Sequence, residues 1–169
     1  VSFMGGTIQE NSLTDEDINY QWVDSHYGGG VWISNYADVV LSGVQILNNK
    51  TIGTGGGVAM GAYCKVQIQE GTLINGNKAS FYGGGIFGKG ANVAMTGGEI
   101  SDNQAKGNGG GIYGNVTMSE QARVEGNKAD NMGGGVHGSL VMNGGILHGN
   151  KTGINGGGGA YGTVTLNEG

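Results

Sequence analysis

Residues 109–136 have the sequence GGGIYGNVTMSEQARVEGNKADNMGGGV, which starts and ends on three consecutive glycines followed by a small apolar residue. The same signature occurs six times in the 169 residues, at intervals of 27, 28, 26, 24 and 24 residues. The six copies begin at Gly28, Gly55, Gly83, Gly109, Gly133 and Gly157. A period of roughly 20–50 residues is typical of solenoids, in which each repeat forms one coil and contacts only its neighbours. The repeat therefore predicts an elongated stack of coils.

Two further patterns recur once per repeat. One is a pair of apolar residues separated by a single residue, as in Val66/Ile68 and Val116/Met118. The other is an apolar residue three positions before an asparagine, and alternation along a strand sends such residues to one face. The glycine triplet and these two patterns are the three landmarks of a repeat. Each landmark indicates a short strand, so a repeat of 24–28 residues holds three strands. These features predict an all-β fold: one right-handed parallel β-helix domain over residues 1–169, with six to seven coils.

The asparagines of the second pattern are expected to form a structural ladder, in which side-chain amides of successive coils hydrogen-bond along the axis. The ladder residues are Asn11, Asn49, Asn77, Asn103, Asn127 and Asn150. The glycine triplets are expected at a tight corner, where a positive φ or a close backbone approach leaves no room for Cβ. No Gly-Lys-Ser/Thr sequence follows any triplet, so a phosphate-binding role is not favoured.

One outward position beside each triplet carries mostly aromatic side chains. The candidate binding residues are Trp32, Phe87, Tyr113, His137 and Tyr161, and Ala59 interrupts them. Stacked coils would place these rings in one column. Two interpretations stay open: a ladder of rings that shields its own sheet, and a contact strip for sugar rings or a neighbouring protein. The second interpretation makes surface glycans a candidate partner and a carbohydrate-binding module the alternative function.

A lysine follows four of the ladder asparagines, at Lys50, Lys78, Lys128 and Lys151, and Gln104 follows a fifth. This column is either a solvated edge that discourages lateral strand pairing or a docking line for an acidic polysaccharide or an anionic surface. Asn115 starts an Asn-x-Thr triplet outside the ladder and is the accessible candidate for glycosylation.

The composition argues against several classes of partner and of bound group. The net charge of −5 argues against nucleic acid as a partner, and no apolar run is long enough for membrane insertion by this segment. No cofactor and no metal are expected, because the histidines share no ligand spacing. A loop insertion at about residues 12–27 breaks the period of the repeats. Its acidic residues and His26 could in principle bind a hard cation, because carboxylates are the ligands of such ions, but their spacing matches no EF-hand loop.

An enzyme is not expected either. A pectate-lyase-like polysaccharide-degrading enzyme needs acidic and basic residues gathered in one groove. Arg123 is the single arginine, and the acidic residues do not converge in the repeat frame. The enzyme interpretation is therefore kept only as the third alternative, a fragment of such an enzyme that lacks its catalytic coils.

Gly-Gly-Gly-Ile at residues 109–112 and apolar-x-x-Asn at residues 124–127 resemble the GGA[ILV] and FxxN repeats of chlamydial polymorphic outer-membrane proteins. More broadly, they resemble right-handed β-helix passenger domains of autotransporters and adhesin-like proteins of bacterial surfaces. Here glycine replaces the alanine, and Ile, Val or Leu replaces the phenylalanine. The resemblance implies an extracellular or cell-surface location and a non-catalytic structural or adhesive role, as a stiff adhesin stalk or a fibre.

Neither end of the sequence supplies the polar cap that a solenoid needs. Residues 1–4 and 163–169 both have the pattern of a strand. We therefore expect either a segment of a longer repeat protein, covered by neighbouring coils, or a fibre subunit that stacks end to end with copies of itself.

Overall fold

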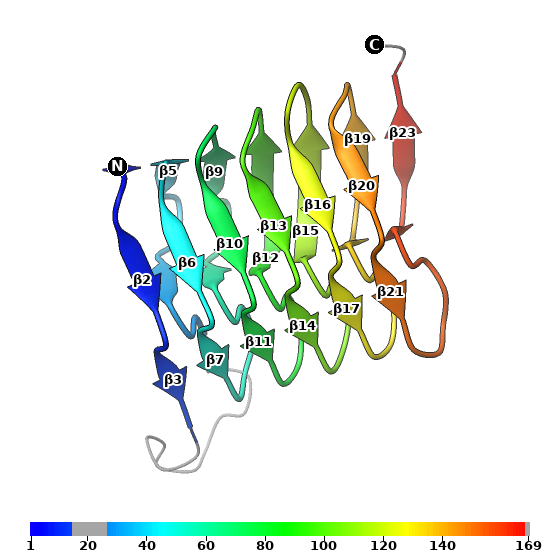
Figure 1. Ribbon diagram of the computed structural model, residues 1–169, viewed down its shortest axis with the longest axis horizontal. Helices are drawn as coiled ribbons and strands as arrows, with labels where there is room; N and C mark the ends of the chain where they lie inside the picture. Colours follow the sequence, from blue (N-terminus) through cyan, green and yellow to red (C-terminus); the bar gives the residue numbers. More distant parts are fainter. Residues whose placement is uncertain (15–26, 168–169) are drawn as a thin grey trace.

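The computed structural model describes residues 1–14 and 27–167, and all regular structure within them is β. The strands form three sheets of 11, six and six strands, here called sheets A, B and C (Figure 1). All pairings within them are parallel, so the predicted β-helix is confirmed. The prediction of six to seven coils was too high: the described strands make about five turns, because the first and last coils are incomplete.

Each coil contributes to all three sheets. Sheet A consists of β1 (Ser2–Met4), β4 (Val31–Ile33), β5 (Asp38–Ser42), β8 (Val58–Met60), β9 (Lys65–Ile68), β12 (Ile86–Met95), β15 (Ile112–Met118), β18 (Val136–His137), β19 (Leu140–Met142), β22 (Ala160–Tyr161) and β23 (Val164–Leu166). Sheet B consists of β2 (Thr7–Gln9), β6 (Gln45–Leu47), β10 (Leu73–Asn75), β13 (Glu99–Ser101), β16 (Arg123–Glu125) and β20 (Ile146–His148). Sheet C consists of β3 (Ser12–Leu13), β7 (Lys50–Thr51), β11 (Lys78–Ala79), β14 (Gln104–Ala105), β17 (Lys128–Ala129) and β21 (Lys151–Thr152).

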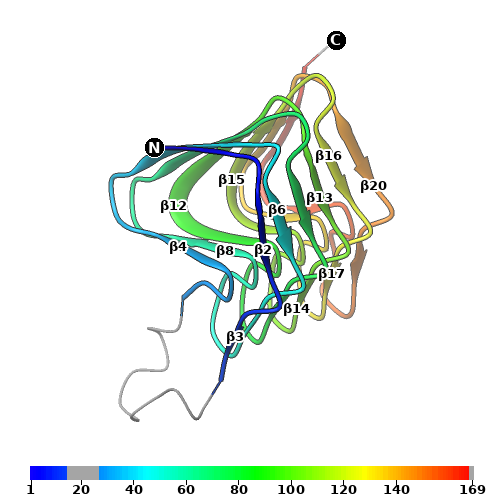
Figure 2. The same ribbon diagram turned by 60° about the vertical axis from the view of Figure 1, so that its left-hand side comes forward.

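The coils wind in the predicted right-handed sense. In Figure 1 the chain advances from left to right while the nearer strands of sheet B run downwards and the more distant strands run upwards. Figure 2 shows the coils nearly end on, as closed loops around a shared interior. Right-handed crossovers are the general rule for parallel strands.

The three landmarks do not map one to one onto three sheets. The strand after each glycine triplet and the strand with the apolar pair both belong to sheet A, and β12 and β15 run through both without a break. Sheet C is made of two-residue strands that start directly after each ladder asparagine. A strand of two residues is too short to show alternation, so the sequence pattern could not reveal it.

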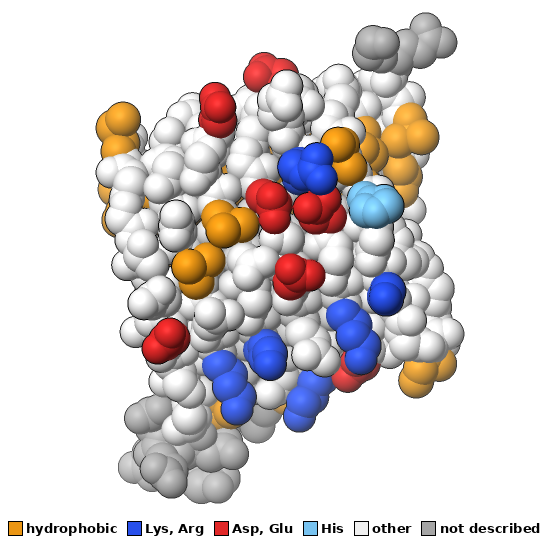
Figure 3. All heavy atoms as spheres, viewed as in Figure 1, with side chains coloured by type: hydrophobic (Ala, Val, Ile, Leu, Met, Phe, Trp, Pro, Cys, Tyr) orange, Lys and Arg blue, Asp and Glu red, His pale blue; other side chains and the backbone are white. Residues whose placement is uncertain are grey.

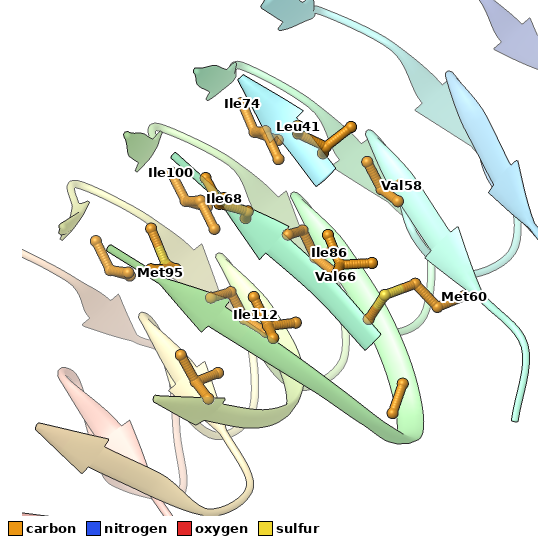
Figure 4. Close-up of a cluster of buried hydrophobic side chains, with 14 of the residues drawn as sticks. Leu41, Val58, Met60, Val66, Ile68, Ile74, Ile86, Met95, Ile100 and Ile112 are labelled. Atoms are coloured by element: carbon orange, nitrogen blue, oxygen red, sulfur yellow. The ribbon is translucent and has the colours of Figure 1, made fainter. Parts of the chain in front are cut away.

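The core consists of apolar columns that run along the axis, with like residues over like (Figure 4). The register places Ile74 between Ile46 and Ile100, and all three are completely buried. Figure 4 shows the side chains of Ile68, Val66 and their neighbours pointing from sheets A and B into one interior. Because each residue packs on its equivalent in the next coil, every column is continuous and leaves few voids.

A left-handed residue precedes each ladder asparagine and turns the chain from sheet B to sheet C. These residues all have φ between 54° and 68°: Glu10, Asn48, Gly76, Asp102, Gly126 and Gly149. Glycine, asparagine and aspartate tolerate this conformation better than other residues, which explains why they occupy five of the six positions. The bend sends the asparagine side chain that follows it into the interior.

The asparagines form a continuous ladder of amides inside this bend. Asn103 is 1% exposed, and its Nδ2 donates to Oδ1 of Asn127 at 3.0 Å and to the carbonyl oxygen of Ile74 at 2.8 Å. Its Oδ1 accepts from the backbone N–H and from Nδ2 of Asn77, both at 2.9 Å. The same pattern of bonds links all six residues: Asn11, Asn49, Asn77, Asn103, Asn127 and Asn150.

The glycine triplets form the corner between sheets C and A. Gly109 has a φ of 68°, a conformation that side chains rarely adopt. A Cβ on Gly110 would collide with the carbonyl oxygen of Gly134 in the next coil, and one on Gly111 would lie 2.7 Å from the carbonyl oxygen of Gly135. Only hydrogen fits at these positions, so the triplet allows the backbones of neighbouring coils to approach closely.

Both ends of the insertion predicted at about residues 12–27 are described by the structure. Ser12 and Leu13 form β3 and pair with β7, and Tyr27 forms a bridge with Thr54. The flanks are therefore part of the solenoid. Residues 15–26, which contain His26 and all the acidic residues of the insertion, lie outside the described residues.

Replacing Asn103 by alanine should lower the free energy of unfolding by about 3 kcal/mol or more, because Asn77 and Ile74 would keep buried polar atoms without partners. Chemical denaturation followed by circular dichroism would measure this loss. Asn155→Ala is the matched control, since Asn155 bonds only to Asn131 at an exposed site. An equal loss in both variants would contradict the importance of the buried ladder.

Gly111→Ala should destabilise the fold by about 1–3 kcal/mol through overpacking against Gly135. In Gly159→Ala the new methyl group would meet only the Leu147 side chain, at 3.1 Å, and the loss should be small. Gly111 and Gly159 are both the third glycine of a triplet, but only Gly111 is covered by a following coil in the described residues. Thermal melting of the two variants therefore measures the effect of the covering coil. Equal melting temperatures would show that close backbone approach does not select glycine here.

Candidate functional site

The outward aromatic residues lie at equivalent positions of sheet A. Strands β4, β8, β12, β15, β18 and β22 pair in register, and each carries the residue at its second position. The column runs Trp32, Ala59, Phe87, Tyr113, His137 and Tyr161. The structure thus brings all five candidate binding residues into one line parallel to the axis.

The rings of this column stack face to face. Tyr113 and His137 have ring centroids 4.7 Å apart and planes inclined by only 7°. The centroids of Phe87 and Tyr113 lie 5.4 Å apart, as do those of His137 and Tyr161. Such stacking contributes about 0.5–1.5 kcal/mol per pair beyond the area buried.

Two aromatic residues that the repeat analysis missed complete the column. Tyr27 contacts Trp32 at 4.7 Å and Phe87 at 6.0 Å, the rings on either side of Ala59. Tyr82 contacts Tyr113 at 5.1 Å. Both tyrosines directly precede a glycine triplet, a position that the sequence could have flagged.

The stacked geometry limits what the column can bind. Sugar rings pack on exposed aromatic faces, but the faces of Tyr113 and His137 are covered by their neighbours along the axis. Exposure rises only toward the ends, to 47% at Trp32 and 42% at Tyr161. The arrangement therefore favours mutual shielding of rings along the sheet over a face-on platform for glycans.

Burial within the column shifts the pKa values of two side chains. It raises the pKa of Tyr113, and the nearby hydroxyl of Tyr82 adds to this effect. It lowers the pKa of His137 below 6.5, although a hydrogen bond with its own backbone acts in the opposite direction. The imidazole Nε2 of His137 also lies 3.4 Å from Nδ2 of Asn108.

Asn115, the candidate for glycosylation, is exposed on β15 and lies in register with Asn92 of β12. Together with Thr117 and Ser139 it lines a shallow depression of about 220 Å³. The other two asparagines in acceptor triplets, Asn49 and Asn150, are held in the ladder. Among the three, Asn115 has the accessible side chain.

The acidic side chains of sheet B are engaged in local contacts. Arg123 pairs with Glu125 at 2.6 Å and lies opposite Glu99 in the neighbouring strand. Asp102 accepts a hydrogen bond from Asn75. In residues 1–14 and 27–167, no three His, Cys, Asp or Glu residues gather in a way that could hold a metal ion. The same residues contain no helix long and apolar enough to cross a membrane.

Comparisons with models of protein families, with curated proteins and with solved structures each gave no match for this chain.

The lowered pKa of His137 makes stability depend on pH. In the unfolded chain the imidazole has a pKa near 6.5, so the unfolded state binds more protons just below that pH. We expect stability to fall as the pH drops from 6.5 toward the folded-state pKa of His137. Thermal melting at neutral and mildly acidic pH should show this slope in the wild type and a weaker slope in His137→Gln. The control Tyr161→Phe keeps the His137 imidazole and the ring stacked on it, and should keep the wild-type slope.

Proposed function

We propose that this chain is a non-catalytic, extracellular structural β-solenoid, a rigid segment of a surface adhesin stalk or fibre whose end faces are covered by further coils of the same kind. The observation that carries the proposal is that the core columns run uncovered out of both ends of the described solenoid. Leu41 is 2% exposed inside, but its column partner Phe3 is 43% exposed. At the other end, Leu166 is 72% exposed although it continues the column of Met142.

The backbone pairing supports the same proposal. The strands β1 and β4 at one end of sheet A, and β22 and β23 at the other, each have one side without a paired strand in the described residues. Open parallel edges next to uncovered apolar columns favour addition of another coil. Two occupants satisfy both features: neighbouring coils of a longer chain and a second copy stacked end to end.

The mechanical role follows from the axial bonding. Each coil is joined to the next by sheet pairing, by the Asn103-type amide bonds and by stacked rings such as Tyr113 on His137. A force that bends the rod must strain all three at once. The resemblance of the repeats to those of bacterial surface β-helices supports an extracellular location. The carbohydrate-binding alternative has less support, because the ring faces of the aromatic column are covered by one another.

The end faces provide the test. Sedimentation velocity and electron microscopy at rising protein concentration should show unbranched rods that lengthen through their ends. Phe3→Asp combined with Leu166→Asp should abolish this association, because burying an unpaired carboxylate is costly.

The matched control combines Tyr36→Asp with Tyr63→Asp, two exposed residues that stack on each other away from the core columns. It should associate like the wild type. A strictly monomeric wild type would contradict end-to-end stacking of copies, and an equal effect of both pairs of substitutions would contradict the end faces as the contact.

A further inference from the structure

Five of the eight basic residues gather on one narrow face of the solenoid, formed by sheet C. The register Lys50↔Lys78↔Gln104↔Lys128↔Lys151 places four of them in one column, with Gln104 in the middle. Lys106 directly follows β14 and is exposed, and its backbone N–H bonds to the carbonyl oxygen of Ala79 in the preceding coil. Five successive coils therefore each carry one lysine on or directly beside sheet C, and these five are here called the lysine row. Figure 3 shows the row as a diagonal band of blue side chains, with acidic side chains gathered above it.

The row lies directly beside the hydrogen-bonded asparagine ladder. In four coils the lysine directly follows a ladder asparagine, whose side chain points inward while the lysine side chain points out. The residue after each lysine is again turned inward, as with the buried Ala79 and Ala129. All five lysines are exposed, so their positions along the axis are defined and their ammonium groups reach solvent.

The charge of the row is largely uncompensated. Lys128 pairs with Asp130, with 3.6 Å between Nζ and Oδ1, and none of the other four lysines forms an ion pair with a described residue. Like charges on directly opposite positions of neighbouring strands destabilise a sheet. The fold does not require lysine here, because Ser12 and Gln104 occupy the same position.

Protection of a sheet edge does not explain the row. Lysine often blocks lateral pairing of an edge strand, but β7, β11, β14 and β17 are each paired on both sides. Neither the fold nor its sheet edges need this row of like charges. The row therefore indicates a ligand of the opposite charge.

From this geometry we propose that the lysine row binds a linear acidic polysaccharide that lies along the solenoid axis. Lys50 and Lys78 are separated by one strand spacing, about 4.8 Å, as are Lys128 and Lys151, and Lys78 and Lys128 are separated by two. An extended chain of uronic acid residues carries one carboxylate per sugar and advances by a similar distance per ring, and the flexible lysine side chains absorb the mismatch.

A polysaccharide fits the row better than a nucleic acid. Single-stranded nucleic acid is bound through aromatic side chains on which bases stack, and the outward positions of β7, β11, β14, β17 and β21 carry only lysine or glutamine. The row also lacks arginine, which is preferred for bidentate phosphate contacts. This binding role is independent of the proposed structural function, because it uses a lateral face and leaves both ends free.

The test measures binding of defined polygalacturonate oligomers by calorimetry at low and at physiological ionic strength. Affinity should rise with oligomer length until the oligomer spans the five lysines, and it should fall with salt as counterion release requires. Fully methyl-esterified oligomers, which lack the charge, should not bind. Absence of binding at low salt, or equal binding of the esterified oligomers, would overturn the proposal.

Two matched variants locate the site. Lys78→Gln with Lys128→Gln changes the row, and Lys65→Gln with Lys89→Gln changes two exposed lysines on sheet A, so each lowers the net charge by two, from −5 to −7. The row variant should lose about tenfold or more in affinity, and the control should lose less than about twofold. Equal losses would reject the lysine row as the site.

Two further readouts separate the alternatives. Because glutamine occurs naturally at residue 104 and the substitutions remove opposed like charges, the row variant should melt at the wild-type temperature or above it. A lower melting temperature would mean that these lysines stabilise the fold, which contradicts the proposal. Tighter binding of oligothymidylate than of polygalacturonate would assign the row to nucleic acid instead. Rod formation in sedimentation should be unchanged in the row variant, so failure of binding and failure of axial stacking are distinguishable.

Discussion

The amides of the four inner ladder asparagines, Asn49, Asn77, Asn103 and Asn127, bond to the coils on both sides of them, and this bonding holds the coils in register. The carbonyl oxygen of the Asn103 side chain accepts two bonds from Asn77, while its amide nitrogen donates both to Asn127 and to the backbone of Ile74. One buried side chain thus satisfies polar groups of several coils in a low-dielectric interior, where unpaired groups are costly. A shift of one coil along the strand direction would break these bonds at every ladder position together.

Fixed register makes every outward position a column. The same constraint that places Ile74 over Ile100 also places Tyr113 over His137 and Lys50 over Lys78. The aromatic residues gain from this arrangement because their faces cover one another. The lysines do not, because their charges repel. The same stacking therefore gives attractive contacts within the aromatic column of sheet A and repulsion within the lysine column of sheet C. Because of this difference, the lysine row indicates a ligand and the rings do not.

The solenoid class could be predicted from sequence because the landmarks repeat with near-constant spacing. The glycine triplets and the apolar-x-x-Asn pattern each reflect a local requirement, such as the positive φ of Gly109 or the inward turn of Asn103. The count of coils was overestimated because incomplete end coils carry the same landmarks as complete ones. Sheet C escaped prediction because β11 and its equivalents have two residues each and alternate with nothing.

By itself, the sequence determined that the chain forms stacked parallel coils and which residues share a column, since spacing alone assigns equivalent positions. Only the tertiary structure decided how those columns behave. It showed that Tyr27 completes the ring stack across Ala59, that the ring faces are covered, and that Lys106 is exposed directly beside β14. These outcomes depend on the directions of side chains and on the bend between sheets, which arise from packing between coils and not from any one repeat.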